Sequence, residues 1–365
     1  MMSTTKRHPA RMTATFGVDA NGHLTGVRFH GDFNTGAYAS WGPTVANRVP
    51  VHAMGPYAVQ AALCTTRAIY TNDPPAGAFR GFGVPQAAIV HEALMDALAE
   101  KLGLDPLEFR HRNALKRGSV TATGQKLEAS AGLQACLEAL RPHWRQMRAD
   151  AEAFNRGSSV LKRGVGIGAM WYGIGNTSMT NPSTMEIGIT GDGQVVLFSG
   201  AVDIGQGSNT VMAQIAADAL GVPVHQIHLV TGDTDRTRDA GKTSASRQTF
   251  VSGNAARLAG EDLRHQILRL GNVGDDAAIR IDGRRIHLKG GGGERTLDLS
   301  RMADVGKGCV LLATGRYDPK TTMLDADGQG IPYETYAFAA QLAAVEVDTG
   351  LGTVKVRKVV AAHDV

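Results

Sequence analysis

The chain has 365 residues, of which 43% are hydrophobic and 20% charged, and its net charge is +4 at neutral pH. This composition is typical of a globular protein with enough apolar material for one large domain or two. The basic residues are scattered and are not interleaved with aromatic residues, which argues against a nucleic-acid-binding protein. No apolar run approaches the length of a membrane span, and the N-terminus lacks the apolar stretch of a signal peptide.

The three cysteines, Cys64, Cys136 and Cys309, exclude two further classes of protein. None lies at CxxC spacing, and an odd number gives no disulfide framework. We interpret them as reduced thiols of a cytoplasmic protein. An iron–sulfur cluster normally needs four thiolate ligands, so this chain does not hold one by itself.

The first half of the chain predicts a β-hairpin followed by three helices. Apolar and polar residues alternate over 11–32 around a turn at Asp19–Gly22, as expected for a hairpin. Residues 85–103 show helical spacing, with Pro85 suited to the first turn and Gly103 to the end. The other two predicted helices run from Asp105-Pro106 through Asn113 and over residues 132–154.

A break at Arg156–Ser159 predicts a domain boundary, with one domain over 1–157 and a second over 158–365. The alternation of hairpins and helices in the second half favours an α+β fold over a doubly wound parallel sheet. Its predicted elements are a glycine-rich stretch at 164–175, strands 184–190 and 194–199, helix 210–220, strand 226–231, helix 246–270, a hairpin at 279–289, a surface loop at 290–293, and strands 338–347 and 353–362. The sequence ends at Val365 directly after a strand, so we expect a continuation in a lost segment or in a partner chain.

The most informative motif is Phe79-Arg80-Gly81-Phe82-Gly83, where an arginine stands between two phenylalanines and is followed by a glycine. Glycines let main-chain amides approach a ligand closely, because no Cβ intervenes. A guanidinium group in such a turn is costly to bury unless it faces an anion or an oxo group. The motif alone is equally compatible with a tight turn that carries one solvated arginine.

Glycine-bearing loops recur at Gly77–Gly83, Gly205–Gly207 and Gly241–Ser246, and each precedes a predicted helix. Because free amides at a helix N-terminus attract anions, three such loops predict a cofactor that carries phosphate. The loop at 203–207 lacks the spacing of a dinucleotide-binding fingerprint. His225 and His228 point to opposite faces of a strand, which favours structural roles over metal ligation.

Several motifs in one order give the chain its resemblance to a known family. They are Lys6-Arg7-His8-Pro9, the 77–86 segment, Gly124–Leu127, Asp203–Gly207, Thr243–Ser246, Gly253-Asn254, Glu346–Asp348 and Ala362–Val365. With these motifs the chain resembles the molybdenum-binding subunit of the xanthine dehydrogenase and aldehyde oxidase family of molybdenum hydroxylases. The resemblance implies a molybdenum–molybdopterin cofactor in which the pterin, and no protein side chain, holds the metal.

The resemblance also implies roles for individual residues. Arg80 matches the arginine whose backbone lies beside the metal, and Phe82 matches an aromatic residue that packs against a flat substrate. Arg48 falls where purine-oxidising members place a substrate arginine, which would stabilise negative charge on a heterocycle; a plain loop arginine is the alternative. The implied site residues are Arg48 and Arg80 for catalysis, Arg48, Phe82 and Ala245 for substrate, and Phe79, Arg80, Gly81, Gly205, Gln206, Gly207, Ser246 and Arg247 for cofactor.

The implied reaction is hydroxylation with oxygen from water, and electrons leave through the pterin to iron–sulfur and flavin centres. Those 2Fe-2S and FAD centres would belong to partner subunits or domains. The family's first pterin loop and its catalytic glutamate fall outside the part of the family that this chain matches. We therefore expect a truncated chain or a split subunit completed by a second molybdenum-subunit chain.

Three functions remain open from the sequence. The first is a hydroxylase component for a purine-like or N-heteroaromatic substrate. The second is an aldehyde or aromatic acyl-CoA oxidoreductase of the same family. The third is a non-catalytic fragment or assembly subunit that lacks the catalytic base.

Overall fold

The computed structural model describes residues 4–291 and 293–364, which form two compact units. One unit contains the described residues up to Met179 and those from Thr321 onward, and the other is Thr180–Lys320. The boundary expected at residues 157–158 falls inside the first unit, where a helix leads into a strand. The two compact units therefore divide the chain differently from the two cofactor-binding domains expected from the sequence.

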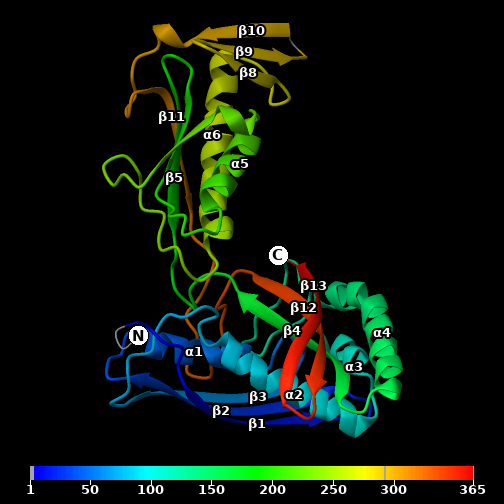
Figure 1. The fold of residues 1–365 in the computed structure, drawn as a ribbon. Helices are drawn as coiled ribbons and strands as arrows, with labels where there is room; N and C mark the ends of the chain where they lie inside the picture. The colour runs from blue at the N-terminus through cyan, green and yellow to red at the C-terminus, as the bar shows by residue number, and fades with distance from the viewer. Residues whose placement is uncertain (1–3, 292, 365) are drawn as a thin grey trace. The chain divides into compact units, whose positions relative to one another are not determined.

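The first unit contains two three-stranded sheets with helices packed on them (Figure 1). The sheet orders are β1-β2-β3 and β13-β12-β4, and β3 alone runs parallel to its neighbour. The elements are β1 (Ala10–Val18), β2 (Leu24–Gly36), α1 (Gly42–His52), β3 (Ala61–Tyr70), α2 (Val84–Leu102), α3 (Pro106–Asn113), α4 (Leu133–Gly157), β4 (Leu161–Gly173), β12 (Tyr336–Asp348) and β13 (Thr353–Asp364).

Strand β4 shows why a glycine-rich stretch can still form a strand. Its larger side chains alternate with glycines, so that Ile167 and Trp171 enter the core while Gly166 lies on the opposite face. Trp171 stacks on Tyr336 of β12 with 4.5 Å between the ring centroids. The stretch left unassigned from sequence is thus a 13-residue strand held by cross-strand packing.

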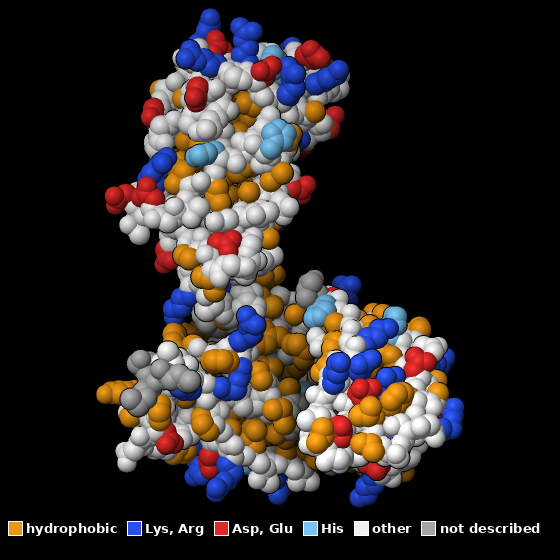
Figure 2. Space-filling model, viewed as in Figure 1, with side chains coloured by type: hydrophobic (Ala, Val, Ile, Leu, Met, Phe, Trp, Pro, Cys, Tyr) orange, Lys and Arg blue, Asp and Glu red, His pale blue; other side chains and the backbone are white. Residues whose placement is uncertain are grey.

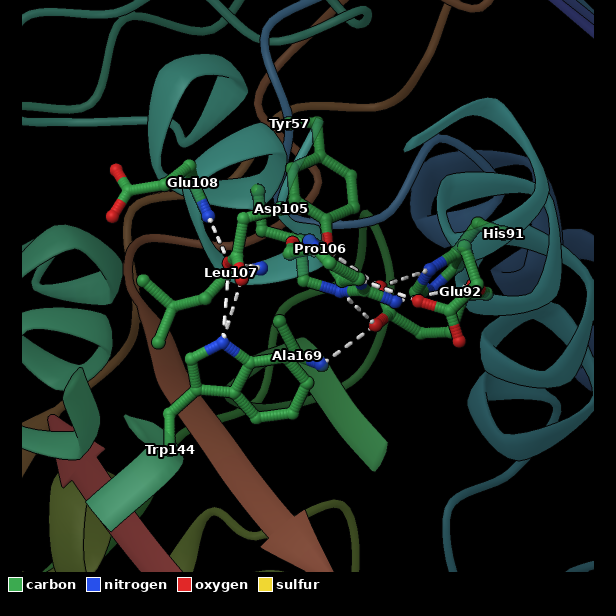
Figure 3. Close-up of polar contacts among 11 residues, drawn as sticks. Tyr57, His91, Glu92, Asp105, Pro106, Leu107, Glu108, Trp144 and Ala169 are labelled. Atoms are coloured by element: carbon green, nitrogen blue, oxygen red, sulfur yellow. Dashed lines mark hydrogen bonds and ion pairs between the residues drawn. The ribbon is translucent and has the colours of Figure 1, made fainter. Parts of the chain in front are cut away.

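A buried ion pair joins α2, α3 and β4 (Figure 3). The Glu92 carboxylate accepts hydrogen bonds from Arg110 Nε at 2.8 Å, Tyr57 Oη at 2.5 Å and the Ala169 amide at 2.8 Å. Burial raises the pKa of Glu92, but the hydrogen bond with His91 and the Arg110 charge outweigh it and bring the pKa to about 2. The carboxylate is therefore ionised at neutral pH and ties two helices to the sheet.

A second carboxylate, Asp105, fixes the start of α3 and its contact with α4. Its side chain accepts from the Leu107 and Glu108 amides as an N-cap, and from the Trp144 indole at 2.9 Å. An N-cap aspartate satisfies amides that the first helical turn leaves unpaired. The sequence Asp105-Pro106 thus begins the helix where it was predicted.

The second unit has a four-stranded sheet in the order β11-β5-β6-β7, with α5 and α6 packed together and α6 lying on β5 and β11 (Figure 1). A small sheet in the order β10-β9-β8 follows α6. The elements are β5 (Ser183–Thr190), β6 (Val195–Ser199), α5 (Ser208–Leu220), η1 (Val224–Gln226), β7 (Ile227–Thr231), η2 (Gln248–Ser252), α6 (Gly253–Gly271), β8 (Ala278–Asp282), β9 (Arg285–Gly290), β10 (Gly293–Asp298), η3 (Leu299–Arg301) and β11 (Cys309–Tyr317).

Basic and acidic side chains are interspersed over the β8–β10 sheet (Figure 2). Arg280 pairs with Asp282 at 3.3 Å and Lys289 with Glu294 at 3.6 Å, and all four side chains are exposed. Such exposed pairs contribute little stability. Within the described residues, no helix is both long and apolar enough to cross a bilayer.

The α+β prediction is confirmed, and most predicted elements appear within a few residues of their expected bounds. The predicted helix at 246–270 is instead a π-helical turn, η2, followed by α6 from Gly253. The predicted loop at 290–293 is a short turn between β9 and β10, with Gly292 outside the described residues, as is Val365. The sequence did not identify α1, β3, β4, β10 or β11.

Replacement of Glu92 by Ala should destabilise the chain by about 3 kcal/mol, because it leaves the buried Arg110 without its main carboxylate partner. Chemical denaturation measures the change, and Glu100→Gln on the same helix, at an exposed position, is the matched control.

The depressed pKa of Glu92 also predicts how wild-type stability depends on pH. The ionised carboxylate should contribute its full stabilisation above pH 4.5, and this stabilisation should be lost as the pH falls toward about 2. A denaturation series between those pH values should show this loss in wild type and not in Glu92→Ala.

Candidate functional site

The Phe79–Gly83 motif forms a strained turn in the first unit, directly before α2. Gly81, Phe82 and Gly83 all have positive φ, at 87°, 49° and 96°. The turn is closed by hydrogen bonds from the Phe82 amide to the Phe79 carbonyl at 2.9 Å and from the Val84 amide to the Gly81 carbonyl at 3.0 Å. A Cβ at Gly83 would lie 2.8 Å from Val49 Cγ2 of α1, so close packing as well as φ requires glycine there.

Some side chains of the turn are exposed, and another packs against a neighbouring residue. Phe79 is 48% exposed, and Arg80 is exposed without any hydrogen bond or ion pair from its guanidinium to the described residues. Phe82 is partly buried, with its ring edge-to-face to Trp41 at a centroid distance of 6.1 Å. The Arg80 carbonyl accepts a 2.6 Å hydrogen bond from Arg7, a contact that the sequence did not indicate.

Arg48 lies on α1 and is buried, with 1% of its surface exposed. Its Nη2 donates to the Gly173 carbonyl at 2.6 Å, Nη1 lies 3.4 Å from the Gly175 carbonyl, and the guanidinium sits 4.2 Å from the centroid of the Tyr172 ring. Beside it, burial and the Arg48 charge lower the pKa of His52 to about 3. Arg48 is thus held by the main chain at the end of β4, and its substrate role stays a prediction.

The Gly205–Gly207 loop in the second unit folds around one carboxylate. Asp203 accepts hydrogen bonds from the Gly205, Gly207 and Asn209 amides at 2.8, 3.2 and 3.1 Å, and these bonds lower its pKa. The sequence predicted free amides at this helix N-terminus, but the aspartate of the same loop occupies them, as an Asx turn does. The Gln206 side chain also turns back onto its own loop, donating to the Val202 carbonyl at 3.2 Å.

The Gly241–Ser246 loop lies against this loop. Thr243 Oγ1 donates to the Val202 carbonyl at 2.8 Å, so the structure brings the second and third predicted loops together within one unit. Ala245 and Ser246 both have positive φ, at 54° and 55°. Left-handed conformations of non-glycine residues cost energy and gather at functional sites. Among the described residues with such a φ, Phe82, Ala245 and Ser246 are three of seven, and all three were predicted site residues.

Arg247 is fully buried beneath the same loop. Its Nη2 donates to the Asn181 and Pro182 carbonyls at 2.8 and 2.7 Å, and its Nη1 to the Ala240 carbonyl. Burial lowers its pKa, because the charged form is desolvated. Its side chain therefore holds the loop from inside and is not presented to a ligand.

The buried arginines differ in how their charge is balanced. Arg110 pairs with Glu92 and with Asp96 at 2.7 Å. Arg48 and Arg247 have no carboxylate within ion-pair distance in the described part of the chain, and the Nε of each is buried without a hydrogen-bond partner. Each unit thus contains a buried arginine without a directly paired carboxylate among its described residues, and the more distant charges of Asp239 and Asp318 partly offset that of Arg247.

These features fit an anionic cofactor better than a metal ion bound by side chains. A Cβ at Gly205 or Gly207 would meet nothing within 4 Å, so open space adjoins the main chain there. Within the ranges that the structure describes, no group of three or more His, Cys, Asp or Glu side chains could hold a metal. Within the second unit, the Gly205–Gly207 main chain and Ala245-Ser246 are surfaces that could contact such a group, and within the first unit the Phe79–Gly83 turn is the corresponding exposed motif.

Comparisons with known proteins identify relatives that bind a molybdopterin cofactor. Two models described as molybdopterin cofactor-binding domain match residues 1–114 and 138–365. The putative xanthine dehydrogenase molybdenum-binding subunit XdhA of Escherichia coli K12 is 37% identical over 273 residues, which cover 73% of this chain and 36% of that protein. The nicotinate dehydrogenase large molybdopterin subunit of Eubacterium barkeri is 49% identical over 138 residues, covering 38% of this chain and 32% of that protein.

A solved structure shares the fold over nearly the whole chain. The aldehyde oxidoreductase from Desulfovibrio desulfuricans ATCC 27774 superposes with a TM-score of 0.83 at 27% identity, covering 98% of this chain and 37% of that one. The matches therefore span about a third of the length of these relatives.

Replacement of Arg247 by Met should destabilise the chain by about 3 kcal/mol, because it leaves carbonyls of two loops without a buried donor. Hydrogen exchange should then accelerate at residues 240–246 and not at α5, and both effects are absent if the arginine only fills space. Arg257→Gln, a half-exposed position on α6, is the matched control and should change neither quantity.

Proposed function

We propose a function that starts from family membership: the chain belongs to the xanthine dehydrogenase and aldehyde oxidase family of molybdopterin-binding proteins. On this basis it is part of a molybdenum-binding subunit that hydroxylates a carbon of a purine-like or N-heteroaromatic substrate. The bound molybdenum cofactor supplies oxygen derived from water and accepts the electrons. Similarity to a xanthine dehydrogenase subunit and to a nicotinate dehydrogenase subunit supports this substrate class.

The observation that carries the proposal is the pair of buried arginines without carboxylate partners, Arg48 and Arg247. An uncompensated buried charge is expensive, and Arg110 shows that this chain can balance one with carboxylates. Asp239 and Asp318 partly offset the charge of Arg247 from a distance. The absence of a directly paired carboxylate for either arginine among the described residues supports an anionic pterin cofactor that carries phosphate. Gly205–Gly207 and Ala245-Ser246 would contact it with main-chain atoms, and Phe82 would pack against the substrate.

The electrons removed from the substrate must pass from the molybdenum cofactor to further redox centres. The described cysteines are three single thiols, and they are not paired with one another. We therefore propose partner subunits or domains that carry 2Fe-2S and FAD, together with the rest of the molybdenum subunit, which would supply the catalytic glutamate. Unpaired thiols also support a cytoplasmic location.

An aldehyde oxidoreductase activity is the second candidate. One observation favours it: the Arg48 guanidinium is engaged by the Gly173 and Gly175 carbonyls and would have to leave them to reach a substrate. The aldehyde oxidoreductase structure that matches the whole chain is consistent with this candidate.

Cofactor content tests the proposal most directly. The chain, purified together with proteins encoded beside its gene, should contain molybdenum and release a pterin nucleotide on acid treatment. Metal analysis and chromatography of the released pterin measure both, and the chain expressed alone is the comparison. A well-folded preparation that lacks both, with and without neighbours, would overturn the proposal and favour a non-catalytic fragment.

Replacement of Arg48 by Lys separates the two substrate classes. If Arg48 stabilises charge on a heterocycle, kcat/KM for a purine should fall at least tenfold more than kcat/KM for an aromatic aldehyde, which corresponds to about 1.4 kcal/mol. Thermal unfolding of the same preparation controls for the cost of altering a buried residue. Equal losses for both substrates would remove Arg48 from substrate binding.

A further inference from the structure

The Lys6–Pro9 segment runs beside the polypeptide that leads into the Phe79–Gly83 turn. The Lys6 amide donates to the Pro75 carbonyl at 3.3 Å, and the Gly77 amide donates to the Lys6 carbonyl at 3.1 Å. These bonds form a short parallel bridge between Lys6 and Ala76. The bridge places the side chain of the next residue, Arg7, at the base of the turn.

Arg7 contacts both arms of the turn. Its Nη2 donates to the Arg80 carbonyl at 2.6 Å, and its guanidinium carbon lies 4.7 Å from the centroid of the Phe79 ring. Nη1 lies 3.5 Å from Oε1 of Gln86, at the beginning of α2. In the described chain Arg7 has no carboxylate partner, so its charge is directed at a carbonyl and an aromatic face.

Gln86 completes the connection. It is 6% exposed, and its Nε2 donates to the His8 carbonyl at 3.1 Å. The Lys6–Pro9 segment is thereby bonded before the turn through Lys6, at the turn through Arg7 and after the turn through Gln86. Residues separated by more than 70 positions in sequence thus form one clamp.

We propose that Arg7 is a positioning residue that fixes the Arg80 carbonyl and, through it, the left-handed path of Gly81-Phe82-Gly83. Glycine adopts a positive φ without steric cost, but Phe82 carries a Cβ, so its positive φ is costly to maintain. A charged donor forms a stronger hydrogen bond to a carbonyl than a neutral one and offsets part of that cost. The inference rests on the proposed function for its purpose, since the fixed main chain would form the floor of the cofactor pocket.

In this proposal the main chain of the turn, and not the Arg80 side chain, is what Arg7 holds in place. The Arg80 guanidinium makes no hydrogen bond or ion pair with the described residues, whereas the Arg80 carbonyl accepts a 2.6 Å hydrogen bond from Arg7. Loss of Arg7 should therefore loosen the turn while leaving the sheets and helices of the unit in place.

Hydrogen exchange of the full chain, followed by mass spectrometry, tests the clamp without cofactor. In Arg7→Gln, amides in a peptide covering 79–86 should exchange at least about fivefold faster, since the bond from a charged donor is lost. A peptide from α5 should be unchanged. Arg11→Gln is the matched control, because Arg11 is an exposed arginine on β1, two residues after the Lys6–Pro9 segment.

Arg7→Lys keeps the charge but loses the planar fork, so exchange at 79–86 should be intermediate. This variant decides the question if Arg7→Gln does not fold. Unchanged exchange at 79–86 in the folded variants would overturn the proposal, as would acceleration spread evenly over the unit in both.

A second readout links the clamp to the cofactor. In preparations made with the neighbouring proteins, Arg7→Gln should hold at least threefold less molybdenum and pterin per chain than wild type, and Arg11→Gln the wild-type amount. If wild type itself holds neither, the proposed function fails while the exchange result still decides the clamp. A loss of cofactor without faster exchange at 79–86 would also overturn the positioning role.

Discussion

A guanidinium group taken out of water needs acceptors for its N–H donors, and this requirement organises both units of the protein. Arg110 satisfies it with carboxylates and joins α2, α3 and β4. Arg48 and Arg247 meet it in part, with main-chain carbonyls that accept from their terminal nitrogens, while the Nε of each has no partner among the described residues. Because a buried carbonyl that is bonded to a cation cannot move without losing that bond, each arginine immobilises the loop that it contacts.

The immobilised loops are also the ones with unusual backbone geometry. Ala245 and Ser246 precede Arg247 directly, and the loop that Arg48 contacts through the Gly175 carbonyl includes Ser178, with a φ of 55°. Strain of this kind persists only where the surroundings over-determine the conformation. Asp203 acts in the same way on its glycine loop, because it bonds amides that would otherwise be free to reorient. A ligand that binds these surfaces meets main chain that is already ordered, which reduces the entropic cost of binding.

Local patterns predicted the elements whose signals lie within a few residues. Asp105-Pro106 begins α3, and Gly103 ends α2 with a left-handed φ of 66°. Strand β4 was missed because glycines replace the outward side chains, and its partner β12 is far away in sequence. Helix α1 was missed because Pro50 lies inside it, and proline normally argues against a helix interior.

The candidate site shows the same division between local and distant signals. The glycine loops and the Phe79–Gly83 motif indicated where the strained turns lie. A positive φ favours glycine, so glycines close together in the sequence mark turns in which such φ values occur. The Asp203 carboxylate could have been recognised from its spacing to Gly205 and Gly207, which is typical of a local Asx turn. Arg7 and Gln86 could not be recognised, since their partners lie more than 70 residues away and no local pattern encodes them.

The first unit is discontinuous, and this affects the order in which the protein can fold. Strand β4 is synthesised long before β12, and the whole of Thr180–Lys320 lies between them in sequence. The second unit contains its own sheets and core, so it can fold on the ribosome while β4 still lacks its neighbour. Until β12 emerges, the Trp171 side of β4 has only helices to cover it. During this interval the nascent chain exposes apolar surface that β12 later covers, and such surface favours chaperone binding and aggregation.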